Sequence, residues 1–387
     1  MIKYINLRKH STFLSNLFIL IFISCQLSPS KAETNITSKE RNKIMLALLL
    51  DTSNSMDGLI EQAKSQLWTI VNELATAKCK DDSKPSIQIA LYEYGNSNLP
   101  ASEGFIRMVT PLTDDLDEIS KNLFELKTNG GDEFCGQVIQ NAIRQLDWSE
   151  SKADLKLIFI AGNEPFNQGN VPYVEACNLA KNNNIFVNTI FCGNFNEGIN
   201  TSWKSGALIT GGSYMSIAQN TKTVYSKTPY DDQINQLNNQ LNDTYIYYGS
   251  MGIKKKREQL AQDINAEFYG KENKVKRAIS KSSHVYQNSN WDLVDALKDD
   301  SEIIEKVEKS KLPNEMKNMT NKEKKEYIDK QTNKRNQIQK EIQSLSLKRK
   351  QYINENKKEN KKEENSLDAI MLKSIKKIAQ SKELVFE

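Results

Sequence analysis

Residues 44–55 read IMLALLLDTSNS, an apolar run that ends abruptly in Asp51 and the hydroxyls of Ser53 and Ser55. The run has no polar alternation, which is typical of a strand buried on both faces in the centre of a parallel sheet. Its end delivers three oxygen-bearing side chains to the carboxyl edge of the sheet, where open α/β folds place their sites. This stretch therefore predicts both the fold class and the position of a candidate site.

The segments that follow alternate between strand and helix. We expect strands at 86–94, 104–109, 155–161 and 185–192, and helices at 58–77, 116–126, 137–148 and 174–182. The turn residues 95–98 between the first two of these strands predict a hairpin, with one antiparallel strand at the sheet edge. Repeated alternation of this kind predicts an α/β domain with a doubly wound, mostly parallel, Rossmann-like sheet over residues 43–250.

The oxygens of Asp51, Ser53 and Ser55 match the ligand preferences of a hard divalent cation. Mg²⁺ is the first choice, with Ca²⁺ or Mn²⁺ as alternatives. A second interpretation is that the two serines only cap the helix that follows, because Ser and Asp are favoured N-cap residues.

A strand ending in Asp-x-Ser-x-Ser, a Gly-Gly loop and a later apolar strand ending in a polar turn resemble the von Willebrand factor type A domain family. The resemblance covers about residues 43–220. It implies a metal-ion-dependent adhesion site, in which the Asp, the two Ser, a Thr of the Gly-Gly loop and a later Asp hold the ion. A carboxylate of a protein partner completes the shell.

Asp51, Ser53 and Ser55 match that pattern, and the other positions depart from it. The Gly-Gly loop continues with Asp132 and Glu133 in place of Thr, and Thr128 lies upstream of the loop. The later strand runs into Ala161-Gly162-Asn163, so that Gly162 stands where the family has Asp. The metal ligands that we predict are therefore Asp51, Ser53, Ser55, Asp132, Glu133 and Asn163. A shell richer in carboxylates neutralises more of the ion's charge and weakens its attraction for a partner's carboxylate.

The first 32 residues predict a signal peptide rather than part of the fold. Basic residues precede the apolar stretch 13–23, and Ser30-Lys31-Ala32 suits cleavage. Phe22-Ile23-Ser24-Cys25 offers an alternative, a lipoprotein signal in which Cys25 carries a lipid anchor. The mature protein is expected to be exported, to the periplasm, the cell surface or the medium.

Charge and histidine content exclude several classes of function. Residues 41–250 hold 16 Lys and Arg against 24 Asp and Glu, and residues 251–387 hold 32 against 23. The basic residues of this tail are interleaved with acidic ones and aromatic residues are few, so we expect no nucleic-acid partner. The only histidines are His10 and His284, which argues against a Ser-His-Asp nucleophile and against His-ligated zinc.

In the predicted order of elements, Cys135, Cys177 and Cys192 lie near the carboxyl edge of the sheet, where Asp51 lies, and Cys79 lies far from this motif edge. In an exported protein we expect one disulfide among the three. The alternative is that all are small buried residues.

Residues 251–387 predict a basic helical tail. We expect helices at 254–278, at 291–309 with Asn290 as cap, and at 321–358, then a flexible polar connection at 357–364. Arg335 and Arg349 interrupt the apolar stripe of the long helix, so this helix is at most partly a coiled coil. We expect it to lie against the α/β domain of residues 43–250, which we call the head, or against a partner. The amphipathic helix 367–379 is expected to dock on protein, with peripheral membrane contact as the alternative.

These observations predict an exported binding or adhesion module of the cell envelope that captures a protein partner, and no enzyme. One alternative is a structural envelope component with a vestigial metal site. Another is a phosphohydrolase with Asp51 as nucleophile, which resembles the haloacid dehalogenase-like hydrolases but has Ser53 in place of their second acid.

Overall fold

The apolar run at residues 44–50 forms the central strand of the protein, β1 (Lys43–Asp51), which is buried along almost its whole length. The structure, a computed structural model, describes residues 42–386 except 219, 221–225 and 357–365. The predicted signal peptide, the lipid-anchor candidate Cys25 and the polar connection 357–364 lie outside the described residues.

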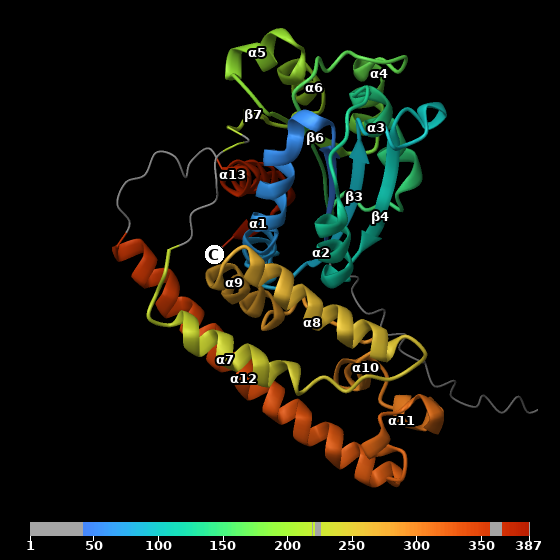
Figure 1. Cartoon of the computed structure of the whole chain (residues 1–387), viewed down its shortest axis with the longest axis vertical. Helices are drawn as coiled ribbons and strands as arrows, with labels where there is room; N and C mark the ends of the chain where they lie inside the picture. The colour runs from blue at the N-terminus through green and yellow to red at the C-terminus, as the bar shows by residue number, and fades with distance from the viewer. Residues whose placement is uncertain (1–41, 219, 221–225, 357–365, 387) are drawn as a thin grey trace, which may run out of the picture. The chain divides into compact units, whose positions relative to one another are not determined.

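Six strands form the main sheet, in the order β4-β3-β1-β5-β6-β7. Its other members are β3 (Ser86–Tyr94), β4 (Ile106–Thr113), β5 (Leu155–Gly162), β6 (Ile185–Phe191) and β7 (Tyr214–Ser216). Only β4 runs antiparallel to its neighbour, and it lies at the sheet edge as the hairpin prediction requires. The predicted fold class, a mostly parallel sheet followed by a helical region, is confirmed (Figure 1).

Helices cover both faces of the sheet, because successive side chains of β1 point to opposite sides. Leu46 and Leu48 pack in one core with α1 (Asp57–Leu74), α2 (Leu116–Glu125) and α13 (Leu367–Ala379). Ala47 and Leu49 pack in the other core with α3 (Cys135–Gln145), α4 (Tyr173–Asn182) and α6 (Trp203–Thr210). The short helix α5 (Phe195–Asn200) follows β6.

The chain leaves β1 toward β3 on one side and reaches β5 on the other, so the strand order reverses at β1. Such a reversal opens a crevice at the carboxyl ends of the strands. Asp51, the last residue of β1, lies at this point.

Helix α7 (Asp231–Asn242) ends the predicted segment 43–250, and the tail then consists of separate helices: α8 (Gly252–Phe268), α9 (Lys271–Lys281), α10 (Leu293–Asp299), α11 (Ile303–Lys306) and α12 (Asn321–Glu355). The predicted helix 254–278 is in fact two helices, because Gly270 between them has φ 122°. The predicted helix 291–309 is likewise broken after Asp299. Its cap is Asp292 and not Asn290, since the Asp292 side chain accepts a hydrogen bond from the Asp295 backbone.

Helix α12 packs along α7, α9 and α10 of its own chain. The two arginines that interrupt its apolar stripe are buried in ion pairs. Arg335 pairs with Asp292 at 2.6 Å, and Arg349 with Asp231 at 2.9 Å. The interruption of the stripe therefore comes from contacts within the chain. Of the two expected places, the head or a partner, the helix reaches the head chiefly at α7, and it otherwise packs on other tail helices.

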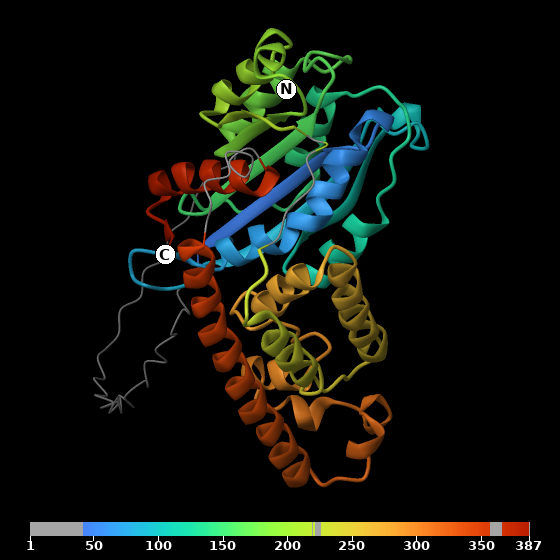
Figure 2. The same cartoon turned by 60° about the vertical axis from the view of Figure 1, so that its left-hand side comes forward.

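Helix α13 returns from the tail to the sheet. Figure 2 shows it beside α1, and Ile370, Met371 and Ile375 are buried in the same core as Leu48. Beyond it, β8 (Val385–Phe386) pairs antiparallel with β2 (Ala77–Lys78). The apolar face of this helix is thus covered by the head, as the docking prediction requires, and is not available to a membrane.

The tail helices meet the head along α1. Tyr269, between α8 and α9, donates a hydrogen bond to Glu61 near the start of α1 at 2.6 Å. Asn72, near the end of α1, donates a hydrogen bond to the Lys276 carbonyl of α9 at 2.8 Å.

The cysteines Cys79, Cys135, Cys177 and Cys192 are free and buried. The expected disulfide is therefore wrong, and the alternative of small buried residues holds. Cys135 and Cys177 pack in the core on the α3 side of the sheet, whereas Cys192 packs on the α1 side. Burial raises the pKa of Cys177 to about 12, which keeps that thiol protonated.

Among the described residues, every helix is too short or too polar to cross a membrane.

Candidate metal-binding site

Asp51 is fully buried at the carboxyl edge of the sheet, opposite Tyr94 of β3. The backbone N–H of Ser53 donates a hydrogen bond to Asp51 Oδ1 at 2.7 Å. The other carboxylate oxygen of Asp51, Oδ2, has no hydrogen-bond partner among the described residues. A buried carboxylate oxygen without a partner is costly, so this atom marks a place where a cation would stabilise the site.

The two serines of the motif form a short polar chain beside Asp51. The Ser53 and Ser55 hydroxyl oxygens lie 3.2 Å apart, and Ser55 Oγ donates to Asn163 Oδ1 at 3.2 Å. Neither the 3-10 turn Asn54–Met56 nor α1 receives a side-chain cap from these residues. The capping interpretation is therefore wrong. Both hydroxyls lie beside Asp51 at the carboxyl edge of the sheet.

The Gly-Gly loop places Glu133, and not Asp132, beside Asp51. Glu133 is buried, and a Cβ at Gly95 would lie 2.7 Å from its Cγ and 2.9 Å from Asp51 Oδ1. Asp132 is exposed. Thr128 is turned to α1, where it donates to Asp57. Thr128 therefore does not stand in for the loop Thr of the family pattern.

Gly162, which stands where the family has Asp, has no room for a side chain. A Cβ there would lie 2.5 Å from Tyr94 Oη and 3.0 Å from Asp51 Oδ2. The Tyr94 hydroxyl is held in this space by donating to the Ala161 carbonyl at 3.0 Å. The second carboxylate of the site is therefore supplied by Glu133, from the other side of Asp51.

Burial and mutual repulsion keep both carboxyls protonated to unusually high pH. Burial raises the pKa of Asp51 to about 7, against the hydrogen bonds from Ser53, and Glu164 adds repulsion. Burial and then the charge of Asp51 raise the pKa of Glu133 to about 8. Among the described residues, no Lys or Arg forms an ion pair with either carboxylate.

Two contributors to this site were missed by sequence reasoning: Tyr94 and Gly95. The predicted strand 86–94 could have pointed to both, because the ends of parallel strands meet at the same edge of a sheet. Glu164, which follows Asn163 in the turn after β5, acts on the site through its charge, which raises the pKa of Asp51 and of Glu133.

The residues at this edge fit a divalent cation. Asp51 and Glu133 supply the negative charge, and the hydroxyls of Ser53 and Ser55 supply neutral oxygens. Among the described residues, no three His, Cys, Asp or Glu side chains converge as a ligand group. A cation held here would therefore depend on the serines as well as on the two carboxylates.

Comparison with known proteins connects this geometry to a family. The von Willebrand factor type A domain matches residues 46–202. Comparison with curated proteins finds no match. The fold is similar to that of the conserved hypothetical protein BatB from Bacteroides thetaiotaomicron, at 16% identity, 45% of this chain, 90% of that chain and TM-score 0.35.

Two further solved structures are similar to this chain. One is the VWA domain of SpRpn10, at 19% identity, 50% of this chain, 94% of that chain and TM-score 0.33. The other is proximal thread matrix protein 1 of the mussel byssus with a zinc-occupied MIDAS motif, at 15% identity, 46% of this chain, 42% of that chain and TM-score 0.33. From the match of residues 46–202 and the strand order around Asp51, we conclude that the chain carries a domain of the von Willebrand factor type A family.

Proposed function

We propose that the domain is a binding module, which holds a divalent cation at the end of β1 and captures a protein partner through it. The observation that supports this most is the pair of buried carboxyls, Asp51 and Glu133, which no basic side chain among the described residues neutralises. Burial without a counter-ion disfavours the charged form of both carboxyls, and a cation at this place would remove that penalty.

Each residue has a distinct part in this proposal. Asp51 and Glu133 would hold the cation and balance its charge, and Ser53 and Ser55 would add neutral oxygens. Asn163 accepts a hydrogen bond from Ser55 and so fixes the direction of that hydroxyl. Asp132, exposed beside the site, is proposed as an outer ligand. The cation, when bound, supplies a positive charge that a carboxylate of the partner can approach. Because all donors are oxygens, Mg²⁺ is proposed first, then Ca²⁺ or Mn²⁺.

The proposed setting is the cell envelope, with an exported chain that is either cleaved after Ala32 or anchored through Cys25. The partner is a protein that presents an acidic side chain. Nucleic acid is not proposed as a partner, since the domain itself is acidic.

A second candidate function is a structural component with no ion at this site. It is favoured by one observation: Ser53, Ser55 and Asn163 already form a chain of polar contacts, each at 3.2 Å. In that case the serine hydroxyls brace the loop after β5 and do not serve as ligands.

Calorimetric titration of Mg²⁺, Mn²⁺ and Ca²⁺ into the full chain at pH 8 tests the proposal. We expect binding of at least one ion, and at least a tenfold loss of affinity in the variant Ser53→Ala, Ser55→Ala. Ser102→Ala, an exposed serine in the 3-10 turn Ala101–Glu103, is the matched control and should bind as the wild type does.

Absence of binding for all three ions, or equal affinity in the double variant, would refute the cation site and leave the structural component. Phosphatase turnover that Asp51→Asn abolishes would instead favour the nucleophile alternative.

A further inference from the structure

Helix α8 carries an apolar face that nothing among the described residues covers. Its other side packs inward through Gln259, Asp263 and Ala266. The outer face presents four large apolar side chains, Ile253 (52% exposed), Leu260 (40%), Ile264 (69%) and Phe268 (83%). Five of the twelve exposed large hydrophobic side chains of the described residues lie in residues 251–268. Such a concentration marks a contact surface rather than the scattered apolar residues of an ordinary surface.

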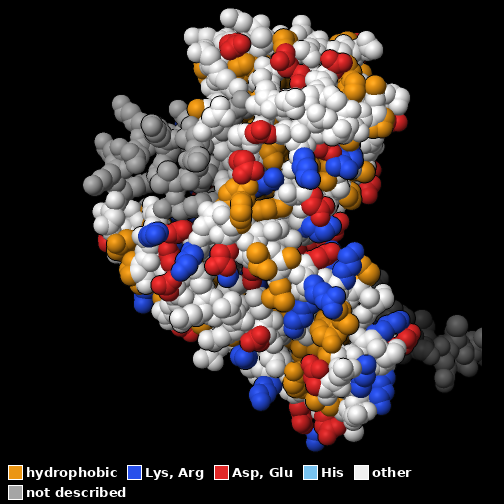
Figure 3. Space-filling model, viewed as in Figure 1, with side chains coloured by type: hydrophobic (Ala, Val, Ile, Leu, Met, Phe, Trp, Pro, Cys, Tyr) orange, Lys and Arg blue, Asp and Glu red, His pale blue; other side chains and the backbone are white. Residues whose placement is uncertain are grey.

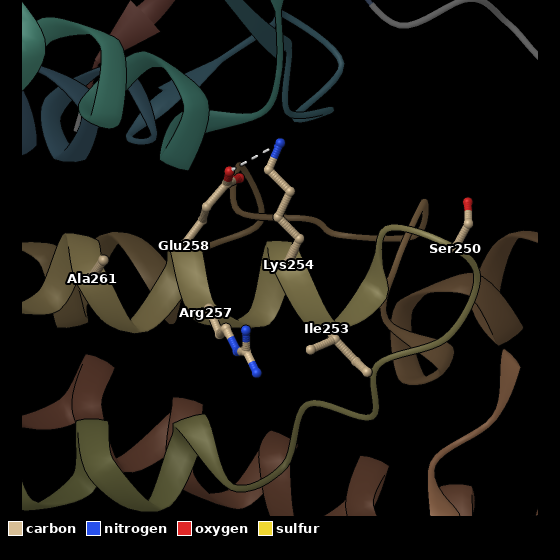
Figure 4. A pocket seen from close by; sticks show the side chains of 6 residues that line it. All are labelled: Ser250, Ile253, Lys254, Arg257, Glu258 and Ala261. Atoms are coloured by element: carbon tan, nitrogen blue, oxygen red, sulfur yellow. Dashed lines mark ion pairs between the residues drawn. The ribbon is translucent and has the colours of Figure 1, made fainter.

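This face is shaped as a trough along the helix. Two rows of side chains at four-residue spacing line a hollow of about 440 Å³: Ser250, Lys254 and Glu258 in one row, and Ile253, Arg257 and Ala261 in the other. Figure 4 shows Lys254 and Glu258 extending to one side of α8, and Ile253 and Arg257 to the other. A groove between two such rows is the surface into which a ridge of a second helix packs.

Arg257 lies within the apolar stripe and is exposed. Among the described residues, no carboxylate pairs with it. Its neighbour Lys255 is in contrast satisfied by Asp115 at 2.9 Å and Glu258 at 3.4 Å. In Figure 3, hydrophobic and basic side chains lie next to one another over the region of α8. An arginine between apolar side chains is a typical anchor of protein interfaces, where a carboxylate of the partner pairs with it.

We propose that this face of α8 docks an amphipathic α-helix of another protein, whose apolar stripe carries a carboxylate that pairs with Arg257. The trough accepts the ridge of the partner helix, and Ile264 and Phe268 extend the apolar contact toward the end of α8. The mode is that of a helix laid on a hydrophobic groove, with anchors at three- and four-residue spacing.

Two other occupants fit the face less well. A bilayer is flat and would bury the middle of the stripe in hydrocarbon, where the charge of Arg257 is costly. In a second copy of α8 the carboxylates near this face are already paired, Glu258 with Lys255 at 3.4 Å and Glu267 with Lys274 at 2.8 Å. The docking face is also separate from the Asp51 site, since α8 packs on α2 and α9. The proposal therefore does not depend on a cation.

Fluorescence anisotropy with three synthetic 18-residue amphipathic helical peptides tests it on the full chain. The peptides share a leucine stripe and differ at one central stripe position, which is Glu, Gln or Lys. We expect the Glu peptide to bind most tightly. Arg257→Glu should weaken its binding at least tenfold and transfer the preference to the Lys peptide. Ile264→Ser should weaken binding of the Glu peptide at least tenfold.

Leu208→Ser, at an apolar side chain of α6 that is 61% exposed, is the matched control and should bind as the wild type does. All three substituted side chains are exposed, so circular dichroism should show unchanged folding. No binding of the Glu peptide, or equal binding of the Glu and Lys peptides to the wild type, overturns the proposal. So does a dimer in sedimentation that Ile264→Ser dissociates, which assigns the face to a second copy. Binding to phosphatidylglycerol vesicles that Ile264→Ser abolishes, with no peptide binding, assigns it to a membrane.

Discussion

Asp51 and Glu133 make the stability of the cation-free protein depend on pH. In an unfolded chain an aspartate loses its proton near pH 4, whereas folded Asp51 keeps it until about pH 7 and Glu133 until about pH 8. Between these limits the folded state binds more protons than the unfolded state. The free energy of unfolding therefore falls as pH rises through this range.

We expect the free energy of unfolding in EDTA to fall by up to about 6 kcal/mol between pH 5 and pH 8, as measured by urea denaturation. Glu133→Gln should flatten the dependence, because the amide has no proton to lose. Addition of Mn²⁺ should restore stability at pH 8 more than at pH 5, since the ligands must be deprotonated to bind it. Stability that is level across this range, or that rises with pH, would contradict the burial of two protonated carboxyls.

Gly162 shows why this site departs from the family pattern. A Cβ added at Gly162 would lie only 2.5 Å from Tyr94 Oη. We expect Gly162→Ala to lower the free energy of unfolding by about 1–3 kcal/mol, because the new methyl group overpacks the site. In a Tyr94→Phe background, which lacks the hydroxyl, the same substitution should cost measurably less. Equal costs in the two backgrounds, in a double-mutant cycle by urea denaturation, would show that the hydroxyl is not the obstacle.

Sequence reasoning reached the residues on β1 because a strand end fixes where their side chains go. Asp51, Ser53 and Ser55 needed only the apolar run and the motif to be placed. The choice between Asp132 and Glu133 could not be made in this way, because the two adjacent residues of a loop point in directions that only the folded backbone decides. Whether the selected residues bind a cation stays a prediction.

Strands and helices of the head were predictable because each has a period and an end signal. The tail was harder. The helical spacing of 254–278 continues across Gly270, so no break is visible in the pattern, although its φ of 122° ends α8 and restarts the chain as α9. Arg335 and Arg349 interrupt the apolar stripe of α12 in the sequence. Their partners Asp292 and Asp231 are distant in the sequence, so the pattern does not show that both arginines are buried in ion pairs.

Helix α13 is distant in sequence from the strands that it covers, but it forms part of their core. Ile375 is fully buried there. We expect Ile375→Ala to lower the free energy of unfolding of the whole head by about 2–5 kcal/mol, the range for deleting a buried aliphatic side chain. Lys377→Ala, on the exposed side of the same helix, is the control and should change it by less than about 0.5 kcal/mol. If Ile375→Ala leaves the denaturation midpoint unchanged, α13 does not contribute to the core in solution.

Head and tail are joined by a buried ionic cluster. Arg277 on α9 is fully buried, pairs with Asp117 of α2 at 2.7 Å and with Asp263 of α8 at 2.6 Å, and stacks 4.7 Å from the ring of Trp68 on α1. Removing this arginine leaves the buried carboxylate of Asp117 without a cation, and leaves Asp263 with Lys281 at 3.3 Å as its remaining cation, which is far more costly than the loss of a surface pair.

We expect Arg277→Met to lower the free energy of unfolding by about 3–5 kcal/mol. Further replacement of Asp117 by Asn should recover part of the loss, because the buried charge without a cation is then gone, whereas Asp263 is left in place to pair with buried Lys281. Calorimetry should show one cooperative transition for head and tail in the wild type. Two separate transitions there, with only one sensitive to Arg277→Met, would contradict the coupling. Lys254→Met, at an exposed lysine of α8, is the control for loss of one positive charge.

The boundary at residue 250 between head and tail stays a prediction, and deletion of 251–387 would not test it. Such a deletion removes α13 together with the tail helices, and so uncovers the sheet face on which Leu48 lies. A cleaner test of the tail leaves 367–386 in place and replaces the intervening helices with a flexible linker.

The late position of α13 also sets the order of events during biosynthesis. The strands β1 to β7 emerge from the ribosome well before residues 367–379 are translated, and until then the sheet lacks one of the helices that cover it. A nascent polypeptide of this kind cannot complete its head early. Under the proposed export, this order means that the head still lacks one of its covering helices until residues 367–379 have been made.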